Sequence, residues 1–328
     1  MTQNYAFQKI PVIDISSLVQ VDINEGEKMK AALEIKNACR NVGFFYVKNH
    51  GISKDHIETV FSEIKRFFDL PIEEKMKIHI GKSNIFRGYT PIGKELTNDK
   101  RDWHESVDFG LDLSIDHPEV VAGKPLQGPN PWPENLPDFR KILTKHWHLM
   151  LNLGSRITEG LALSLKLEQN YFQQFTSKSQ SSMRILHYPP YQIHEPAKNI
   201  GDGIGAHIDY GFLTILAQDA IGGLEVRNAA NEWIPAPHIP GTFIINMGHM
   251  TQRWTNDFYK ATLHRVRSKP NKSRYSFPFF FEPNFDTVVA PLESLCSPEN
   301  PPGYEPFHFG TYLIEKFTRS YAENIIED

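Results

Sequence analysis

The sequence places a histidine and an aspartate two residues apart, His207 and Asp209, directly before the apolar run GFLTIL. In a β-strand, residues i and i+2 project from the same face, so both side chains could bind one metal ion. The pair alone is weak evidence for a metal site, because a chain with 14 histidines is expected to contain about one His-x-Asp by chance. His264, in the β-rich segment TLHRVRS, offers a third ligand. Two imidazoles and one carboxylate suit a non-haem Fe(II) with open coordination positions, and zinc accepts the same ligands.

A second pattern lies in the segment RYSFPFFFEP. Here Arg274, Ser276 and Phe280 fall on one face of a predicted strand, subject to distortion at Pro278. A buried arginine is costly unless a carboxylate meets it, and the sequence supplies no obvious partner. The carboxylate of a bound ligand is therefore one candidate partner, gripped by the guanidinium and the serine hydroxyl. An acidic residue distant in the sequence is the other.

The first half of the chain is predicted to be mainly helical. Residues 27–42, a segment capped by Ser53, and residues from about 138 to 167 carry apolar side chains at helical spacing. Residues 9–16 predict a short edge strand, because they contain a proline. The stretch 81–137 is rich in Gly, Pro, Asn and Asp and predicts loops with short strands.

The pattern changes in the second half. From about residue 182 to 285, short β-rich runs alternate with turns, which is typical of an all-β sandwich or barrel. A last amphipathic stretch, 309–325, predicts a helix. We therefore expect a mixed α/β (α+β) protein in which helical elements surround a β core.

A wider pattern extends along the chain through the stretches IPVIDIS, NVGFFYVKNHGI, FRGYTP, WHESVDFG, HIDYGFLTIL, GGLEV, GTFIINMG, HRV and RYSFPFFFEP. In these stretches the chain resembles the isopenicillin N synthase-like family of Fe(II)- and 2-oxoglutarate-dependent oxygenases. The resemblance implies a double-stranded β-helix, or jelly roll, for the core. It also implies three regions, which we expect to be an N-terminal region over 1–178, the jelly-roll core over 179–290 and a C-terminal helical extension over 291–328.

The resemblance also implies roles for individual residues. The implied Fe(II) ligands are His207, Asp209 and His264. Arg274 and Ser276 would bind the distal carboxylate of 2-oxoglutarate, and Tyr188, in LHYPP, is a further candidate contact to this co-substrate. Leu186 stands where the family has an asparagine. No side chain beyond the metal site is assigned a catalytic role.

The implied reaction oxidises a C–H bond of a small molecule with O2, by hydroxylation, desaturation or cyclisation, and converts 2-oxoglutarate to succinate and CO2. One alternative is an Fe(II)-dependent oxidase of the same fold that does not use 2-oxoglutarate. Another, from a different class, is a non-catalytic jelly-roll protein that binds a small molecule. Three residues are candidate substrate contacts: Arg87 and Tyr89 in the FRGYTP loop, and Phe280.

The composition limits the classes of partner and the compartment that we expect for this protein. The net charge of −4 and the lack of a basic cluster with interleaved aromatics predict no nucleic-acid partner. The N-terminus is too polar for a signal peptide, and no apolar run approaches the roughly 18 residues of a membrane span. Two cysteines without C-x-x-C spacing predict a reduced, cytoplasmic protein. We expect a monomer or a weak homodimer.

The metal assignment gives a direct prediction. Replacing His207 or Asp209 by alanine removes one ligand, so iron-dependent turnover is expected to be abolished in either variant. Oxygen consumption with Fe(II), 2-oxoglutarate and substrate measures it, and full activity in either variant contradicts the assignment.

Overall fold

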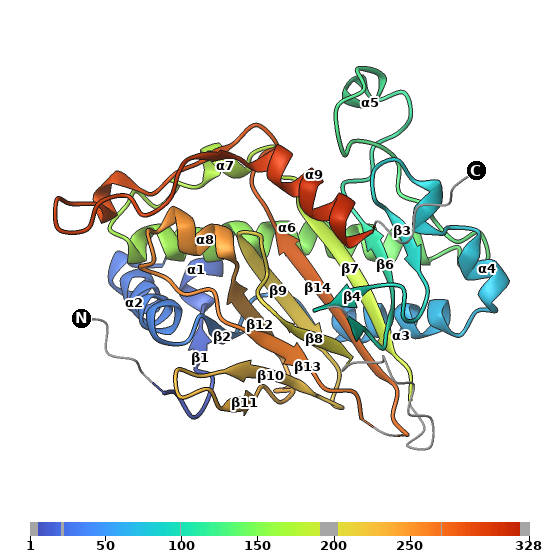
Figure 1. The fold of residues 1–328 in the computed structure, drawn as a ribbon. Helices are drawn as coiled ribbons and strands as arrows, with labels where there is room; N and C mark the ends of the chain where they lie inside the picture. Colours follow the sequence, from blue (N-terminus) through green and yellow to red (C-terminus); the bar gives the residue numbers. More distant parts are fainter. Residues whose placement is uncertain (1–5, 21–22, 99, 191–202, 270, 322–328) are drawn as a thin grey trace.

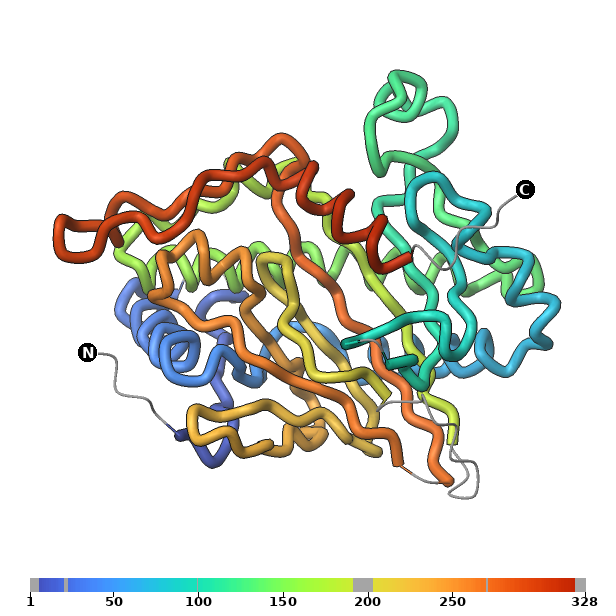
Figure 2. The backbone as a smooth tube through the Cα atoms, viewed as in Figure 1, coloured from blue at the N-terminus to red at the C-terminus, as the bar shows by residue number. Residues whose placement is uncertain are grey.

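The structure, a computed structural model, describes residues 6–20, 23–98, 100–190, 203–269 and 271–321. Two β-sheets face each other at its centre, and long helices cover the outer face of the larger sheet (Figures 1 and 2). This arrangement confirms the mixed α/β fold and the two-sheet core that the second half of the sequence predicts.

Within the described residues the larger sheet has eight strands. Across the sheet they run in the order β1 (Val12–Asp14), β2 (Phe44–Lys48), β12 (Thr242–Met247), β9 (Leu213–Gln218), β14 (Arg274–Phe281), β7 (Ser182–Tyr188), β6 (Glu105–Phe109) and β3 (Gly88–Thr90). All neighbours are antiparallel except β1 and β2. As predicted, β1 lies at an edge, and β3 and β6 are short strands within the stretch 81–137, predicted to hold loops with short strands.

The smaller sheet has four strands among the described residues. Their order is β11 (Trp233–Pro235), β10 (Leu224–Arg227), β13 (His264–Val266) and β8 (Ile204–His207). Two further antiparallel pairs are β4 (Leu96–Thr97) with β5 (Lys100–Arg101), and β15 (Val288–Val289) with β16 (Phe307–His308). Apolar side chains from both main sheets, among them Tyr188, Val226 and Ile244, form a small core where the sheets meet.

The helices follow the predicted positions closely. The long ones are α2 (Glu25–Asn41), α3 (Lys54–Phe68), α6 (Phe139–Ser164) and α9 (Phe309–Ser320). Ser53 caps α3, because its hydroxyl accepts a hydrogen bond from the backbone N–H of His56 (3.3 Å). The predicted extension of the last helix over residues 322–325 lies outside the described residues. None of the described helices is both long and apolar enough to cross a membrane.

Shorter helical segments connect these elements. They are α1 (Ser16–Val19), α4 (Ile72–Met76), α5 (Pro118–Val121), α7 (Gln173–Thr176), α8 (His249–Trp254) and the 3-10 turns η1 (Ile80–Lys82) and η2 (Glu293–Leu295). The segment around α5 projects from the body of the molecule, and α9 crosses the end of the larger sheet beside β7 (Figure 1).

Strand β14 has two chemically different faces. Phe277 packs edge-on against Phe61 of α3 (ring centroids 4.7 Å apart), and Phe279 packs against Trp147 of α6 (5.8 Å). These contacts place the odd-numbered phenylalanines of β14 under the helices. The even-numbered side chains point to the space between the two sheets: Arg274, Ser276, Pro278 and Phe280.

β14 contains a proline although it lies inside the sheet, where a residue without an N–H weakens the ladder. Pro278 pairs with Leu216 of β9, whereas the register with β7 passes from Ser276 to Phe279 without pairing Phe277 or Pro278. The ladder is interrupted on the β7 side only, so the strand keeps its alternation through the proline.

The close approach of α6 to β14 gives a test of the packing. A Cβ on Gly154 of α6 would lie 2.3 Å from Cδ2 of Phe281, which is buried. We expect Gly154→Ala to lower the free energy of unfolding by about 1 kcal/mol, because overpacking costs about 1–3 kcal/mol and the gain in helix propensity is about 1 kcal/mol. Urea denaturation measures the change. Asn152→Ala, at an exposed position of α6, is the control, and equal stability of the two variants contradicts the tight contact.

Candidate active site

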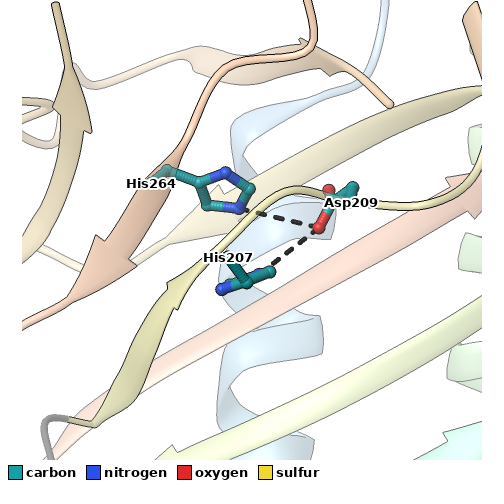
Figure 3. Close-up of side chains that lie close together, drawn as sticks. All are labelled: His207, Asp209 and His264. Carbon is teal, nitrogen blue, oxygen red and sulfur yellow. Dashed lines mark ion pairs between the residues drawn. The ribbon is translucent and has the colours of Figure 1, made fainter. Parts of the chain in front are cut away.

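Three potential metal ligands meet between the two sheets. His207 ends β8, His264 begins β13, and Asp209 lies just beyond β8 (Figure 3). Nε2 of His207 lies 3.4 Å from Oδ1 of Asp209, and Nε2 of His264 lies 3.6 Å from the same oxygen. One donor atom from each residue fits within a 4.8 Å span. The structure therefore brings together the three residues that the sequence analysis connected.

The backbone arrangement that brings His207 and Asp209 together differs from the predicted one. His207 and Asp209 do not share a strand, because β8 ends at His207 and Asp209 lies in the connection to β9. The backbone carbonyl of Asp209 accepts a hydrogen bond from the N–H of His249 (2.7 Å), which holds this connection in place. The register of the smaller sheet places His264 next to His207, because the two residues are paired across β13 and β8. The three potential ligands are therefore brought together by a connection and a cross-strand pair, and not by one face of a single strand.

Both imidazoles are oriented by backbone carbonyl groups. Nδ1 of His207 lies 2.8 Å from the carbonyl oxygen of Gly205, and Nδ1 of His264 lies 3.1 Å from that of Thr262. A protonated Nδ1 that donates to a carbonyl leaves the Nε2 lone pair free to bind a metal. Burial, followed by the neighbouring His207, lowers the pKa of His264 to about 4, so this imidazole is neutral at neutral pH.

The carboxylate of Asp209 is held by two side chains that the sequence analysis missed. Thr214 Oγ1 (2.6 Å) and Asn246 Nδ2 (2.7 Å) both donate to Oδ2, which leaves Oδ1 turned toward the histidines. Burial alone would raise the pKa of Asp209, but the two histidines and Thr214 outweigh it and hold the pKa below its usual range. Thr214 and Asn246 are each a polar residue in an otherwise apolar strand. This was the one signal in the sequence that could have indicated their role.

Arg274 lies in the same cavity of about 370 Å³ as the three ligands. Its side chain is 2% exposed, and Nη1 donates to Ser276 Oγ (3.0 Å) while Nη2 donates to Gln218 Oε1 (3.2 Å). Nε donates to the carbonyl of Gly222 (2.7 Å), and the guanidinium lies 4.5 Å from the ring centre of Tyr188. Among the described residues no carboxylate lies within ion-pair distance of Arg274. The alternative of an acidic protein partner distant in the sequence is thus not supported.

The other end of the cavity is lined by an ionic cluster that the sequence analysis did not find. Arg184 of β7 makes two hydrogen bonds to Asp108 of β6 (2.9 and 3.0 Å) and one to Glu95 (2.8 Å). Tyr321, directly after α9, donates to the same Asp108 carboxylate (2.9 Å). Glu282, the residue after β14, lines this end as well. Because Arg184 and Glu282 continue the even-numbered faces of two strands, strand alternation was the available signal.

Arg87 and Tyr89 were predicted to contact substrate, and the structure places both outside this cavity. Arg87 is buried, and its guanidinium donates to the carbonyl oxygens of Leu111, Gly128 and Leu126 (2.7–2.9 Å). Tyr89 is 1% exposed and donates to a buried carboxylate of Glu105 (2.6 Å). These hydrogen bonds hold both side chains inside the protein and favour structural roles for them, so the expected substrate contacts of Arg87 and Tyr89 stay predictions. Phe280, by contrast, lines the cavity.

Similarity to known proteins agrees with this geometry. Residues 10–135 match the non-haem dioxygenase N-terminal family named for morphine synthesis, and residues 179–283 match the 2OG-Fe(II) oxygenase superfamily. A homoarginine-6-hydroxylase of Oryza sativa subsp. japonica is 37% identical over 96% of this chain and 98% of its own length. The chain belongs to the 2-oxoglutarate–Fe(II) oxygenases.

Two further relatives extend the comparison. The 2-oxoglutarate-Fe(II) type oxidoreductase hxnY of Emericella nidulans is 33% identical over 95% of this chain and 90% of its own length. The crystal structure of a full-length Neurospora crassa protein in complex with α-ketoglutarate and thymine superposes with a TM-score of 0.82, at 29% identity, over 95% of this chain and 97% of that one. These similarities confirm the isopenicillin N synthase-like resemblance and the jelly-roll core.

As a member of this superfamily, the protein is an oxidoreductase that uses Fe(II), 2-oxoglutarate and O2. The site chemistry fits this conclusion, because two imidazoles and a carboxylate are the usual protein ligands of non-haem Fe(II). The alternatives of a non-catalytic binding protein and of an oxidase independent of 2-oxoglutarate are not favoured.

One substitution distinguishes a structural role of Tyr89 from the predicted substrate contact. Tyr89→Phe removes the hydrogen bond to the buried Glu105 carboxylate, so we expect the free energy of unfolding to fall by about 1.5–3 kcal/mol while the KM for substrate is unchanged. Chemical denaturation and steady-state kinetics measure the two quantities. A raised KM at unchanged stability would restore the substrate contact.

Proposed function

We propose that His207, Asp209 and His264 hold Fe(II), that Arg274 and Ser276 bind the distal carboxylate of 2-oxoglutarate, and that Tyr188 is a further contact to this co-substrate. The observation that carries this assignment is the buried guanidinium of Arg274, which has no carboxylate partner among the described residues and opens into the cavity of the three ligands. A bound carboxylate supplies the missing negative charge, and Ser276 adds a hydrogen bond.

When bound, Fe(II) and 2-oxoglutarate supply the oxidant that removes hydrogen from a substrate C–H bond. The chain's own residues orient and enclose this chemistry. Thr214 and Asn246 fix the Asp209 carboxylate, and the Tyr188 ring covers the Arg274 guanidinium. Apolar side chains line the cavity between the metal ligands and the arginine and limit access of water: Leu186, Leu216, Leu224 and Val266.

We propose that the substrate is a small molecule that binds beside Phe280, between β14 and α9, and is hydroxylated. The Oryza relative is named for hydroxylating homoarginine, and the Neurospora structure contains thymine. Both molecules are small, polar and rich in nitrogen, which agrees with the charged lining around Arg184. Desaturation and cyclisation are the remaining outcomes, and the mass of the product distinguishes them.

We further propose that the chain acts in the cytoplasm as a monomer or weak homodimer, without a nucleic-acid partner. The small negative net charge and the two free cysteines, Cys39 and Cys296, support this setting. The division into 1–178, 179–290 and 291–328 is supported by the limits of the two family matches, although β1, β2, β3 and β6 of the first region complete the larger sheet.

An anaerobic titration tests the co-substrate assignment. Adding Fe(II) and 2-oxoglutarate is expected to produce a visible charge-transfer band, and Arg274→Met is expected to raise the Kd for 2-oxoglutarate at least about 30-fold, because charged hydrogen bonds of about 2 kcal/mol are lost. Arg265→Met, on β13 of the smaller sheet and paired with Glu225, is the control and keeps the Kd. No band in the unmodified protein, or an unchanged Kd in Arg274→Met, contradicts the proposal.

A further inference from the structure

Glu282 is a buried carboxyl group without a cationic partner. It is 3% exposed, lines the cavity and follows β14 directly. Its Oε2 accepts a hydrogen bond from the backbone N–H of Phe212 (2.9 Å). Within the described part of the chain, no donor reaches Oε1 and no Lys, Arg or His lies within ion-pair distance. A buried carboxyl in this state is costly to the fold, so a functional reason for it is needed.

The backbone opposite Glu282 leaves space for this carboxyl. Gly211 also lines the cavity, and a Cβ at this position would lie 1.7 Å from Oε1 of Glu282. Any side chain at residue 211 would thus displace the carboxyl. The site consists of a carboxyl with one tethered oxygen and one oxygen without a protein donor, beside the ligand Asp209.

The charged residues around Glu282 do not neutralise its carboxylate. Arg184 is the one arginine that lines this end of the cavity among the described residues, and it is already paired with Asp108 and Glu95. Burial raises the pKa of Glu282 to about 8, although the hydrogen bond from Phe212 opposes the rise. A cation that entered this end would find an acceptor that no protein group uses, and its charge would lower the pKa of Glu282 and hold the carboxyl in the ionised form.

We propose that Glu282 anchors the substrate, and that it selects small molecules carrying a guanidinium or ammonium group. This inference rests on the proposed function, since it concerns the substrate of the same iron site. The cation donates to the unpartnered Oε1 and so places the rest of the molecule toward Phe280 and the metal ligands. A neutral hydrogen-bonding group, such as an amide or a nucleobase edge, is the competing occupant and would gain little from a carboxylate.

Pairs of probes that match in length and differ in whether the side chain ends in a cationic or a neutral group test the anchor. Isothermal titration calorimetry compares L-homoarginine with its neutral ureido counterpart L-homocitrulline, and L-lysine with 6-hydroxy-L-norleucine. It is carried out anaerobically, with and without Fe(II) and 2-oxoglutarate. We expect at least one cationic probe to bind about tenfold more tightly than its neutral counterpart or better. Equal binding within both pairs, or binding of none of the four, overturns the proposal.

Variants at Glu282 assign the preference to this residue. Glu282→Gln keeps an acceptor for the N–H of Phe212 but loses the charge, so the ratio of affinities is expected to fall close to one while the charge-transfer band and the Kd for 2-oxoglutarate persist. Glu282→Asp keeps the charge and is expected to retain part of the preference, which a purely structural role would not explain. Glu293→Gln, at an exposed position of η2, is the matched control.

The outcomes separate the two proposals. A missing band in the unmodified protein refutes the iron and 2-oxoglutarate assignment, while the calorimetric ratio still decides whether Glu282 recognises a cation. An unaltered ratio in Glu282→Gln refutes the anchor alone. Thermal unfolding of each variant, compared with the unmodified protein, verifies that a lost preference does not come from a lost fold.

Discussion

The alternation of side chains along β14 is the constraint on which the rest of the structure depends. Its odd-numbered phenylalanines are buried under α3 and α6, so its even-numbered residues must face the space between the sheets. A shift of one residue would bury Arg274 under the helices and turn phenylalanines into the cavity. The apolar core and the functional site are therefore stabilised by the same packing, and Pro278 is tolerated because only the β7 side of the ladder is interrupted.

The three proposed metal ligands depend on both sheets for their positions. The smaller sheet supplies the two histidines, while the larger sheet supplies the side chains that orient the carboxylate, Thr214 from β9 and Asn246 from β12. These two residues are paired across neighbouring strands, so their donors converge on one oxygen of Asp209. The geometry of the ligands is fixed by backbone carbonyls and buried polar side chains before any ion arrives, which lowers the cost of ordering the site on binding.

Charge is distributed unevenly along the cavity. Arg274 and Glu282 lie on the same face of one strand, near its opposite ends, and both are buried without an opposite charge from the described protein. Between them the lining is mainly apolar, with the metal ligands on the facing sheet. A site with this pattern favours two charged molecules of opposite sign, each held at its own end, and keeps their reacting parts near the metal in a region poor in water.

Much of this arrangement could be predicted from local sequence patterns. Helical spacing and the Ser53 cap identify α2, α3 and α6, and the period of two in RYSFPFFFEP separates Arg274, Ser276 and Phe280 from their neighbours, because these periods follow from backbone geometry alone. The joint occurrence of His207, Asp209, His264 and Arg274 indicates the iron site. Contacts between distant segments could not be predicted in this way. Which loops and strands meet is not encoded by any local period. It decides three features: the backbone carbonyls that accept hydrogen bonds from Arg87, the cross-strand pairing of His207 with His264, and the lack of a cationic partner for Glu282.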